Sequence, residues 1–165
     1  MFRGLNKNPF IPTFLRAFLG DRTRYSVTSV AFSPDGKTLA AGNNHDIIFW
    51  EVTNSKPPRQ LGTFSVGVNS TRIVAFSPDG KTLVSGGTFG IGLLDVTNPK
   101  SPMWLSSLSL SEKNDEYIFA NSVNSVAFSP DGKTLALGRG TGYKDETVGL
   151  WDVTNPKAPR QLSVL

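Results

Sequence analysis

Short apolar runs, separated by turn-forming Gly, Pro, Asn and Asp residues, follow one another along most of the chain. Short runs between such turns are typical of β-strands, whereas helices need longer segments of helical period. The first four predicted strands are Val27–Phe32, Thr38–Ala41, Ile47–Val52 and Arg59–Phe64. These strands are apolar on both faces more than they alternate, which is expected of sheets stacked between neighbouring sheets.

One decapeptide occurs three times in the chain. Val-Ala-Phe-Ser-Pro-Asp-Gly-Lys-Thr-Leu stands at 30–39, 74–83 and 126–135, so the units are offset by 44 and 52 residues. Each unit of such a repeat buries its apolar surface by stacking on its neighbours. The repeats extend the strand prediction to Arg72–Phe76, Thr82–Ser85, Ile91–Val96 and Met103–Leu108 in the second unit, and to Val123–Phe128, Thr134–Leu137, Val148–Val153 and Arg160–Leu165 in the third.

A second motif follows each decapeptide. It reads Phe-Trp-Glu-Val-Thr-Asn at 49–54, Leu-Leu-Asp-Val-Thr-Asn at 93–98 and Leu-Trp-Asp-Val-Thr-Asn at 150–155. The third unit is five residues longer between the two motifs, and the extra residues fall within Arg139–Glu146. In the Ser-Pro-Asp-Gly turn, Pro presets φ, Asp accepts hydrogen bonds from the backbone ahead, and Gly tolerates a positive φ. We therefore predict a structural role for Asp35, Asp79 and Asp131.

With both motifs in register three times, the chain resembles the WD-repeat β-propeller family, especially its bacterial members. The resemblance covers about residues 25–165, in units at about 25–66, 67–110 and 121–165. It implies an all-β fold, a β-propeller segment of three four-stranded antiparallel blades that closes by self-association or as part of a larger propeller. It also implies a non-catalytic scaffold that binds other proteins, and no enzyme activity.

Two features depart from the family pattern. The Gly-His dipeptide that usually precedes the first strand is absent, and Leu94 and Glu51 replace the usual Trp and Asp. Because His45 is the only histidine, the family's His-centred hydrogen-bond network cannot form. We therefore expect blades held mainly by apolar stacking, with the second unit the weakest because it has Leu94 where Trp is usual.

Charge separates residues 1–24 from the repeats. This N-terminal segment has five Lys and Arg residues against one Asp, whereas the rest of the chain has twelve basic and twelve acidic residues. Nucleic-acid binders spread basic residues over the folded surface, so we expect no nucleic-acid partner. Within this basic and apolar N-terminal segment, we predict that Phe14–Leu19 forms a strand that completes a neighbouring blade, or that a short amphipathic helix follows Pro12.

The sequence also bears on compartment. No apolar run is long enough to span a membrane, so no membrane partner is expected. The chain has no Cys, which excludes thiolate sites and fits a reducing compartment. The expected location is therefore cytoplasmic.

Few residues suit catalysis or ligand binding. His45 stands beside Asp46 in a loop, without a second motif of metal ligands or a nucleophile. The Gly-rich segment 138–144 precedes a predicted strand, whereas a phosphate-binding loop precedes a helix. We predict no catalytic residue, no cofactor and no metal site. Two other classes stay open: an enzyme or small-ligand binder that uses the propeller axis, and a truncated fragment of a larger multidomain regulator.

Partner binding is expected at one rim of the blades, because specificity usually lies in loops on a rigid frame. The candidate residues lie in loops between second and third strands and in segments that lead into first strands: Arg24, Tyr25, Asn44, His45, Arg72, Phe89, Arg139, Tyr143 and Lys144. Arg and Tyr are frequent among interface hot spots, so we expect Tyr143 with Arg139 to anchor a protein partner.

Closure is the remaining question at the level of sequence. Propellers need about four to eight blades to close, and three repeats leave two flat apolar faces open. We therefore expect self-association, most simply a homodimer that forms a six-bladed ring with two-fold symmetry.

Overall fold

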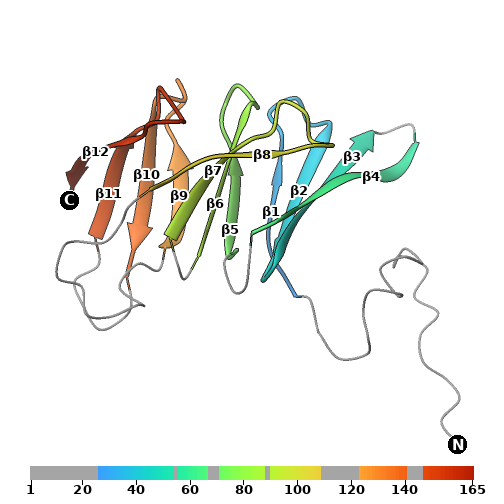
Figure 1. Cartoon of the computed structure of the whole chain (residues 1–165), viewed down its shortest axis with the longest axis horizontal. Helices are drawn as coiled ribbons and strands as arrows, with labels where there is room; N and C mark the ends of the chain where they lie inside the picture. Colours follow the sequence, from blue (N-terminus) through green and yellow to red (C-terminus); the bar gives the residue numbers. More distant parts are fainter. Residues whose placement is uncertain (1–25, 54–55, 67–70, 88–89, 109–122, 141–146) are drawn as a thin grey trace, which may run out of the picture.

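The computed structural model describes residues 26–53, 56–66, 71–87, 90–108, 123–140 and 147–165. These residues form three four-stranded antiparallel sheets, and none of them is helical. We call the sheets blades 1, 2 and 3 in chain order, and they stand side by side along the molecule (Figure 1). The predicted all-β fold of three four-stranded blades is confirmed.

Each blade is a meander in which every strand pairs with the next one along the chain. Blade 1 consists of β1 (Val27–Phe32), β2 (Thr38–Asn43), β3 (Asp46–Thr53) and β4 (Lys56–Ser65); blade 2 of β5 (Ile73–Phe76), β6 (Thr82–Gly87), β7 (Gly90–Asp95) and β8 (Met103–Leu108); blade 3 of β9 (Val123–Phe128), β10 (Thr134–Arg139), β11 (Thr147–Asp152) and β12 (Arg160–Val164). The largest difference from the sequence prediction is the start of β4 at Lys56, because its ladder with β3 continues to the pair Thr53–Lys56.

The Ser-Pro-Asp-Gly turn is built by the same hydrogen bonds in all three blades. In blade 1, Gly36 N donates to Ser33 O at 2.8 Å, and Asp35 Oδ1 accepts from Ser33 Oγ at 2.6 Å and from Lys37 N at 3.0 Å. The φ angle of Gly36 is +68°, a conformation that side chains with a Cβ rarely adopt. The same carboxylate bonds recur at Asp79 and Asp131, so the three aspartates shape the turns.

Each blade has an N-side face, toward the preceding blade, and a C-side face, toward the following blade. Between blades 1 and 2, one buried cluster joins Ala40, Ile47 and Phe49 of the C-side face to Val74, Leu83, Leu94 and Val96 of the N-side face. Between blades 2 and 3, a second cluster joins Val84, Ile91, Leu93 and Leu108 to Val123, Leu135, Leu137, Trp151 and Val153. The two interfaces use equivalent positions of the repeat, so burial of apolar surface holds the blades in a row.

Trp50 shows what happens where a neighbour is missing. Its equivalents in the repeat are Leu94 and Trp151, which are 0% and 6% exposed. Trp50 is only half-buried, because no blade of the described residues covers the N-side face of blade 1. The motif therefore places this side chain toward the preceding blade, and its burial depends on that blade.

Polar contacts also cross the blade interfaces. Near the inner strands, Thr28 Oγ1 donates to Thr71 O at 2.8 Å and Val74 N donates to Ser29 Oγ at 3.1 Å. Near the outer strands, Ser106 Oγ of blade 2 donates to the Pro156 carbonyl oxygen of blade 3 at 2.6 Å. These bonds fix the register of one blade on the next, which apolar stacking alone leaves free.

Candidate interaction surfaces

The antiparallel meander sorts the connections of the blades into two rims. The turns between first and second strands and between third and fourth strands lie together, at the top of Figure 1, and we call this edge the turn rim. The ends of the second strands, the starts of the third strands and the starts of β1, β5 and β9 lie at the opposite edge, which we call the loop rim. Of the predicted partner-binding residues, the four that the structure describes lie at the loop rim: Asn44, His45, Arg72 and Arg139.

The β2–β3 connection of blade 1 carries Asn44 and His45 at its tip. Asn43 is 6% exposed, and its Oδ1 accepts from His45 N and from Asp46 N, both at 2.8 Å. The buried amide thus holds the backbone of the connection in one shape and presents the two following side chains at the loop rim. Both of these side chains are half-buried, so only part of each is available to a partner.

Arg72 and Arg139 bring positive charge to the same rim from blades 2 and 3. Arg72 is exposed, and its backbone N donates to Gly86 O at 2.7 Å just before β5 begins. Arg139 ends β10 opposite Thr147 and is half-buried. The rim therefore gathers predicted residues from three blades, although each stands in its own loop rather than in one shared cluster.

The other predicted partner-binding residues lie outside the described residues. They are Arg24, Tyr25, Phe89, Tyr143 and Lys144, and the N-terminal segment 1–24 lies outside them as well. The expected pairing of Tyr143 with Arg139 and the predicted strand or helix in the N-terminal segment stay predictions.

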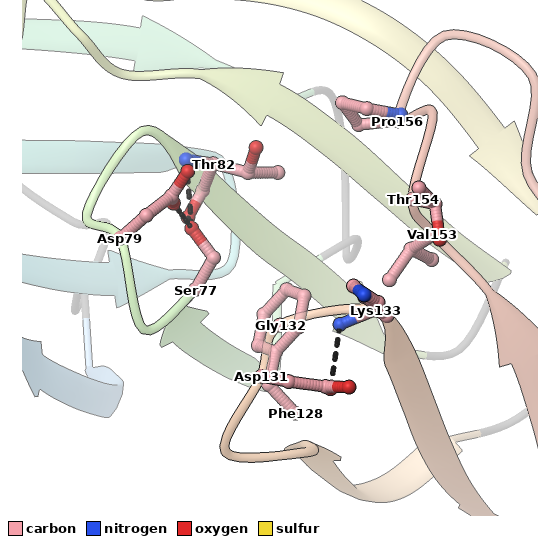
Figure 2. Close-up of a pocket in the computed structure, with 10 residues that line it drawn as sticks. All are labelled: Ser77, Asp79, Thr82, Phe128, Asp131, Gly132, Lys133, Val153, Thr154 and Pro156. Carbon is pink, nitrogen blue, oxygen red and sulfur yellow. Dashed lines mark hydrogen bonds between the residues drawn. The ribbon is translucent and has the colours of Figure 1, made fainter.

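A cavity of about 270 Å³ opens on the turn rim between blades 2 and 3 (Figure 2). The sequence did not predict this cavity, because it forms only where the Ser-Pro-Asp-Gly turn of blade 2 meets the corresponding turn and residues 153–156 of blade 3. Its lining is Ser77, Asp79, Thr82, Phe128, Asp131, Gly132, Lys133, Val153, Thr154 and Pro156. Two carboxylates and one ammonium group give it a mixed polar character above the apolar interface.

Both carboxylates of this cavity are already engaged in their own turns. The hydrogen bond from Ser129 Oγ, followed by that from Lys133 N, lowers the pKa of Asp131. Burial acts to raise the pKa of Asp79, but hydrogen bonds from Ser77 and the backbone of Lys81 outweigh it, so the pKa is lowered. Both groups are ionised at neutral pH and accept hydrogen bonds, which is the opposite of a carboxyl group tuned to donate a proton.

Among the described residues, no three His, Cys, Asp or Glu side chains lie close enough together to hold a metal ion. No helix in the described part of the chain is long and apolar enough to cross a membrane.

The two ends of the row of blades expose apolar side chains. On the N-side face of blade 1, Val30 and Phe32 are each 59% exposed, whereas the equivalent Val74 in blade 2 is 4% exposed. At the other end, in blade 3, Val148 is 40% exposed, whereas the equivalent Ile91 is 3% exposed. The same positions of the repeat are thus buried inside the row and open at its two ends.

Comparison with known proteins identifies the repeat. The family model for the WD domain, G-beta repeat, matches residues 13–51 and 115–152. No curated protein matches the sequence.

Solved structures share the fold at low sequence identity. The chain is similar to Saccharomyces cerevisiae Sqt1, with 17% identity and a TM-score of 0.67 over 88% of this chain and 36% of that one. It is similar to the WD40 repeats of RRP9, with 20% identity and a TM-score of 0.66 over 87% of this chain and 39% of that one. A Bacteroides uniformis protein assigned as a 6-phosphogluconolactonase gives 18% identity and a TM-score of 0.68, over 85% of this chain and 41% of that one.

The chain therefore spans about two fifths of the length of these neighbours. At such identities the likeness concerns the fold, and the fold is the stacked blade described above. The neighbours include proteins of different function, so function has to be argued from the surfaces of this chain.

Proposed function

Because the chain belongs to the WD-repeat family, we propose that it is a non-catalytic scaffold that binds other proteins through its loop rim. The observation that carries the proposal is that the turns and strands of the blades repeat closely, whereas the loops at the loop rim do not. The Ser-Pro-Asp-Gly turns repeat the same hydrogen bonds in all three blades, whereas the loop rim differs from blade to blade in sequence and length. A repeated rigid frame with varied loops is how binding surfaces are commonly built.

An enzyme or small-ligand binder that uses the propeller axis is the competing proposal, and the turn-rim cavity between blades 2 and 3 offers it no support. An acid–base enzyme needs titratable groups whose pKa values suit proton transfer. The carboxylates of the turn-rim cavity instead have lowered pKa values and are held by their own turns. The likeness to the protein assigned as a lactonase concerns the fold alone.

The partner-binding surface that we propose is the loop rim with Arg24, Tyr25, Asn44, His45, Arg72, Phe89, Arg139, Tyr143 and Lys144. Arg72 supports this surface because its side chain is exposed and its backbone N is held by the hydrogen bond to Gly86 O. Arg139, at the end of β10, would form the anchor of the third blade together with Tyr143. Arg and Tyr combine contact area with hydrogen bonding, which suits them to this role. A cytoplasmic location stays part of the proposal.

We also propose that two copies of the chain associate into a six-bladed ring. Exposed Val30, Phe32 and Val148 at the two ends of the row support it, because their equivalents inside the row are buried or half-buried. An exposed apolar patch of more than a few hundred Å² is uncommon on a monomer and marks an interaction site.

The scaffold proposal is tested by affinity capture with the full chain and quantification of the proteins retained. We expect a protein retained by the wild type to bind the double variant Arg139→Ala and Tyr143→Ala at least tenfold more weakly. The matched control is Lys81→Ala with Lys157→Ala, which removes two side chains from the turn rim. Equal loss in both variants, or full binding by the Arg139 and Tyr143 variant, would move the binding surface away from the loop rim.

A further inference from the structure

We infer that the C-side face of blade 3 seats on the N-side face of blade 1 of a second copy, in the same way that consecutive blades of one chain pack on each other. The inference rests on the proposed ring of two copies and specifies how the copies meet. It is carried by three features that recur, unused, at the two ends of the row: two are used at both internal interfaces, and one is used between blades 1 and 2 only.

The first feature is a proline that covers a glycine in the turn of the next blade. Pro34 Cδ of blade 1 lies 3.3 Å from the position that a Cβ would take at Gly80 of blade 2. Pro78 Cδ of blade 2 lies 3.4 Å from the same position at Gly132 of blade 3. At Gly36 of blade 1 nothing lies within 4 Å of that position. Pro130, in the turn of blade 3, is the third proline of the series and is exposed.

The second feature is a serine that accepts a hydrogen bond from the next blade. Ser29 Oγ of blade 1 accepts from Val74 N of blade 2 at 3.1 Å. Blade 2 has Ile73 at this position, so it cannot repeat the bond toward blade 3. Blade 3 has Ser125, and the matching donor in blade 1 is the backbone N of Val30.

The local backbone of Ser125 resembles that of Ser29. A register shift precedes each serine in its ladder with the second strand, and the partners are Gly42 for Ser29 and Gly138 for Ser125. Ser125 is exposed and Val30 is 59% exposed, so both are accessible. Blade 3 thus has the hydrogen-bonding residue that the C-side face of blade 1 uses toward blade 2.

The third feature is the reciprocal size of side chains across each interface. Phe49 of blade 1 shares its buried cluster with Leu94, whereas Leu93 of blade 2 shares its cluster with the larger Trp151. Each interface thus combines one aromatic side chain with one leucine from the opposite blade, and together they fill the space between the two blades. Blade 3 offers Leu150 at the C-side position and blade 1 offers Trp50 at the N-side position. Leu150 against Trp50 of a second copy repeats the Leu–Trp combination.

The area of the faces fits a stable pair of chains. Four strands at about 4.8 Å spacing, each about five residues long, make a face of roughly 320 Å². Two such faces per chain give roughly 650 Å², close to the about 800 Å² per partner of a standard interface. Two chains of three blades give a ring of six, which lies inside the range in which propellers close.

The test uses arginine substitutions at the two exposed positions, one on each face. Ser125→Arg blocks only the C-side face of blade 3, and Val30→Arg blocks only the N-side face of blade 1. In light scattering at micromolar concentration we expect the wild type at twice the chain mass of 17.8 kDa and each variant at that mass, with association weakened at least tenfold. Ala158→Arg, in the exposed turn between β11 and β12, is the control and should stay at twice the mass.

Mixing the two variants then tests the head-to-tail arrangement. The Val30→Arg chain keeps its C-side face and the Ser125→Arg chain keeps its N-side face, so a mixture regains one intact contact and should form a pair with one chain of each kind. Circular dichroism verifies that both variants are folded. A wild type at the mass of one chain overturns the ring and the inference together. A wild type at twice the mass, with one or both variants unaffected or with no pair in the mixture, overturns the head-to-tail contact alone. Neither result bears on partner capture at the loop rim.

Discussion

The indole ring of Trp104 lies directly over Gly92, so that its six-membered ring occupies the place of a Cβ at that position. The ring also stacks on Phe64 of blade 1, with centroids 6.4 Å apart and an interplanar angle of 11°. Trp104 thereby ties the outer strand of blade 2 to that of blade 1, although it is 51% exposed. We expect Gly92→Ala to displace this ring and to destabilise the protein by about 1–3 kcal/mol, as overpacking does.

The matched control for that substitution is Gly149→Ala, the same position in blade 3. There a Cβ would meet Trp151 Nε1 at 3.4 Å, an ordinary contact. Tryptophan fluorescence and urea denaturation should show a large change for Gly92→Ala and a small change for Gly149→Ala. Equal effects of the two substitutions would mean that Trp104 does not depend on Gly92.

The two tryptophans of the repeat motif should respond differently to truncation. Trp151 is 6% exposed inside the interface of blades 2 and 3, so Trp151→Ala should cost about 3–5 kcal/mol of unfolding free energy. Trp50 is half-buried at the open end of the row, so Trp50→Ala should cost less in the single chain and should weaken self-association instead. Urea denaturation measured together with particle mass separates the two effects, and equal stability losses without any change in mass would contradict this account.

The turn aspartates predict a loss of stability in acid. Hydrogen bonds from Ser33 and the backbone of Lys37 lower the pKa of Asp35, and the backbone bond from Thr154 with the Arg160 contact lowers that of Asp152 to about 2. A pKa that is lower in the folded state contributes stability above the ordinary value of 3.8, and this stability is lost as the pH falls toward 2. Thermal melts between pH 5 and pH 2 should show a falling Tm, with a shallower fall for Asp152→Asn. A Tm that does not change across this range would argue against structural aspartates.

In the single chain, as the Val30→Arg variant provides it, blade 2 should be the best-protected blade in hydrogen exchange, which reverses the order expected from its Leu94. The smaller side chain removes one aromatic contact, but blade 2 is covered on both faces, and Leu83, Val84, Leu93 and Leu94 are all 0% exposed. Amides in β6 and β7 should therefore exchange more slowly than those in β3 and β11. Fastest exchange in blade 2 would restore the interpretation from sequence.

The row of blades could be predicted from the sequence because each blade repeats the same turn residues and the same short apolar runs. The Asp-Gly turn and the apolar runs act within a few residues, so the strands were predictable to within a few positions. Burial was less predictable, because it depends on what covers a face: Trp50 and Trp151 occupy the same position of the motif and differ in exposure. The contact of Trp104 with Gly92 and the turn-rim cavity arise from packing between units, which no pattern within one unit contains.

The sequence predicted which residues lie at the loop rim, but it did not predict how their backbone is held there. The antiparallel meander puts Asn44, Arg72 and Arg139 at one edge once the strand order is known. The buried Asn43 amide, which orders the backbone beneath Asn44 and His45, had no signal in the sequence beyond an Asn before a short connection. The remaining predicted residues of the rim lie outside the described residues and stay predictions.

Whether the open ends of blades 1 and 3 close on a second copy is measured most directly by small-angle X-ray scattering of the unmodified chain. Forward scattering gives the mass, and a compact particle of two such chains has a radius of gyration of about 20 Å. We expect a mass of twice 17.8 kDa and that radius, unchanged over a tenfold range of micromolar concentrations. A mass of one chain at every concentration, or a mass and radius that grow continuously as an open filament would, would contradict the closed ring of two copies.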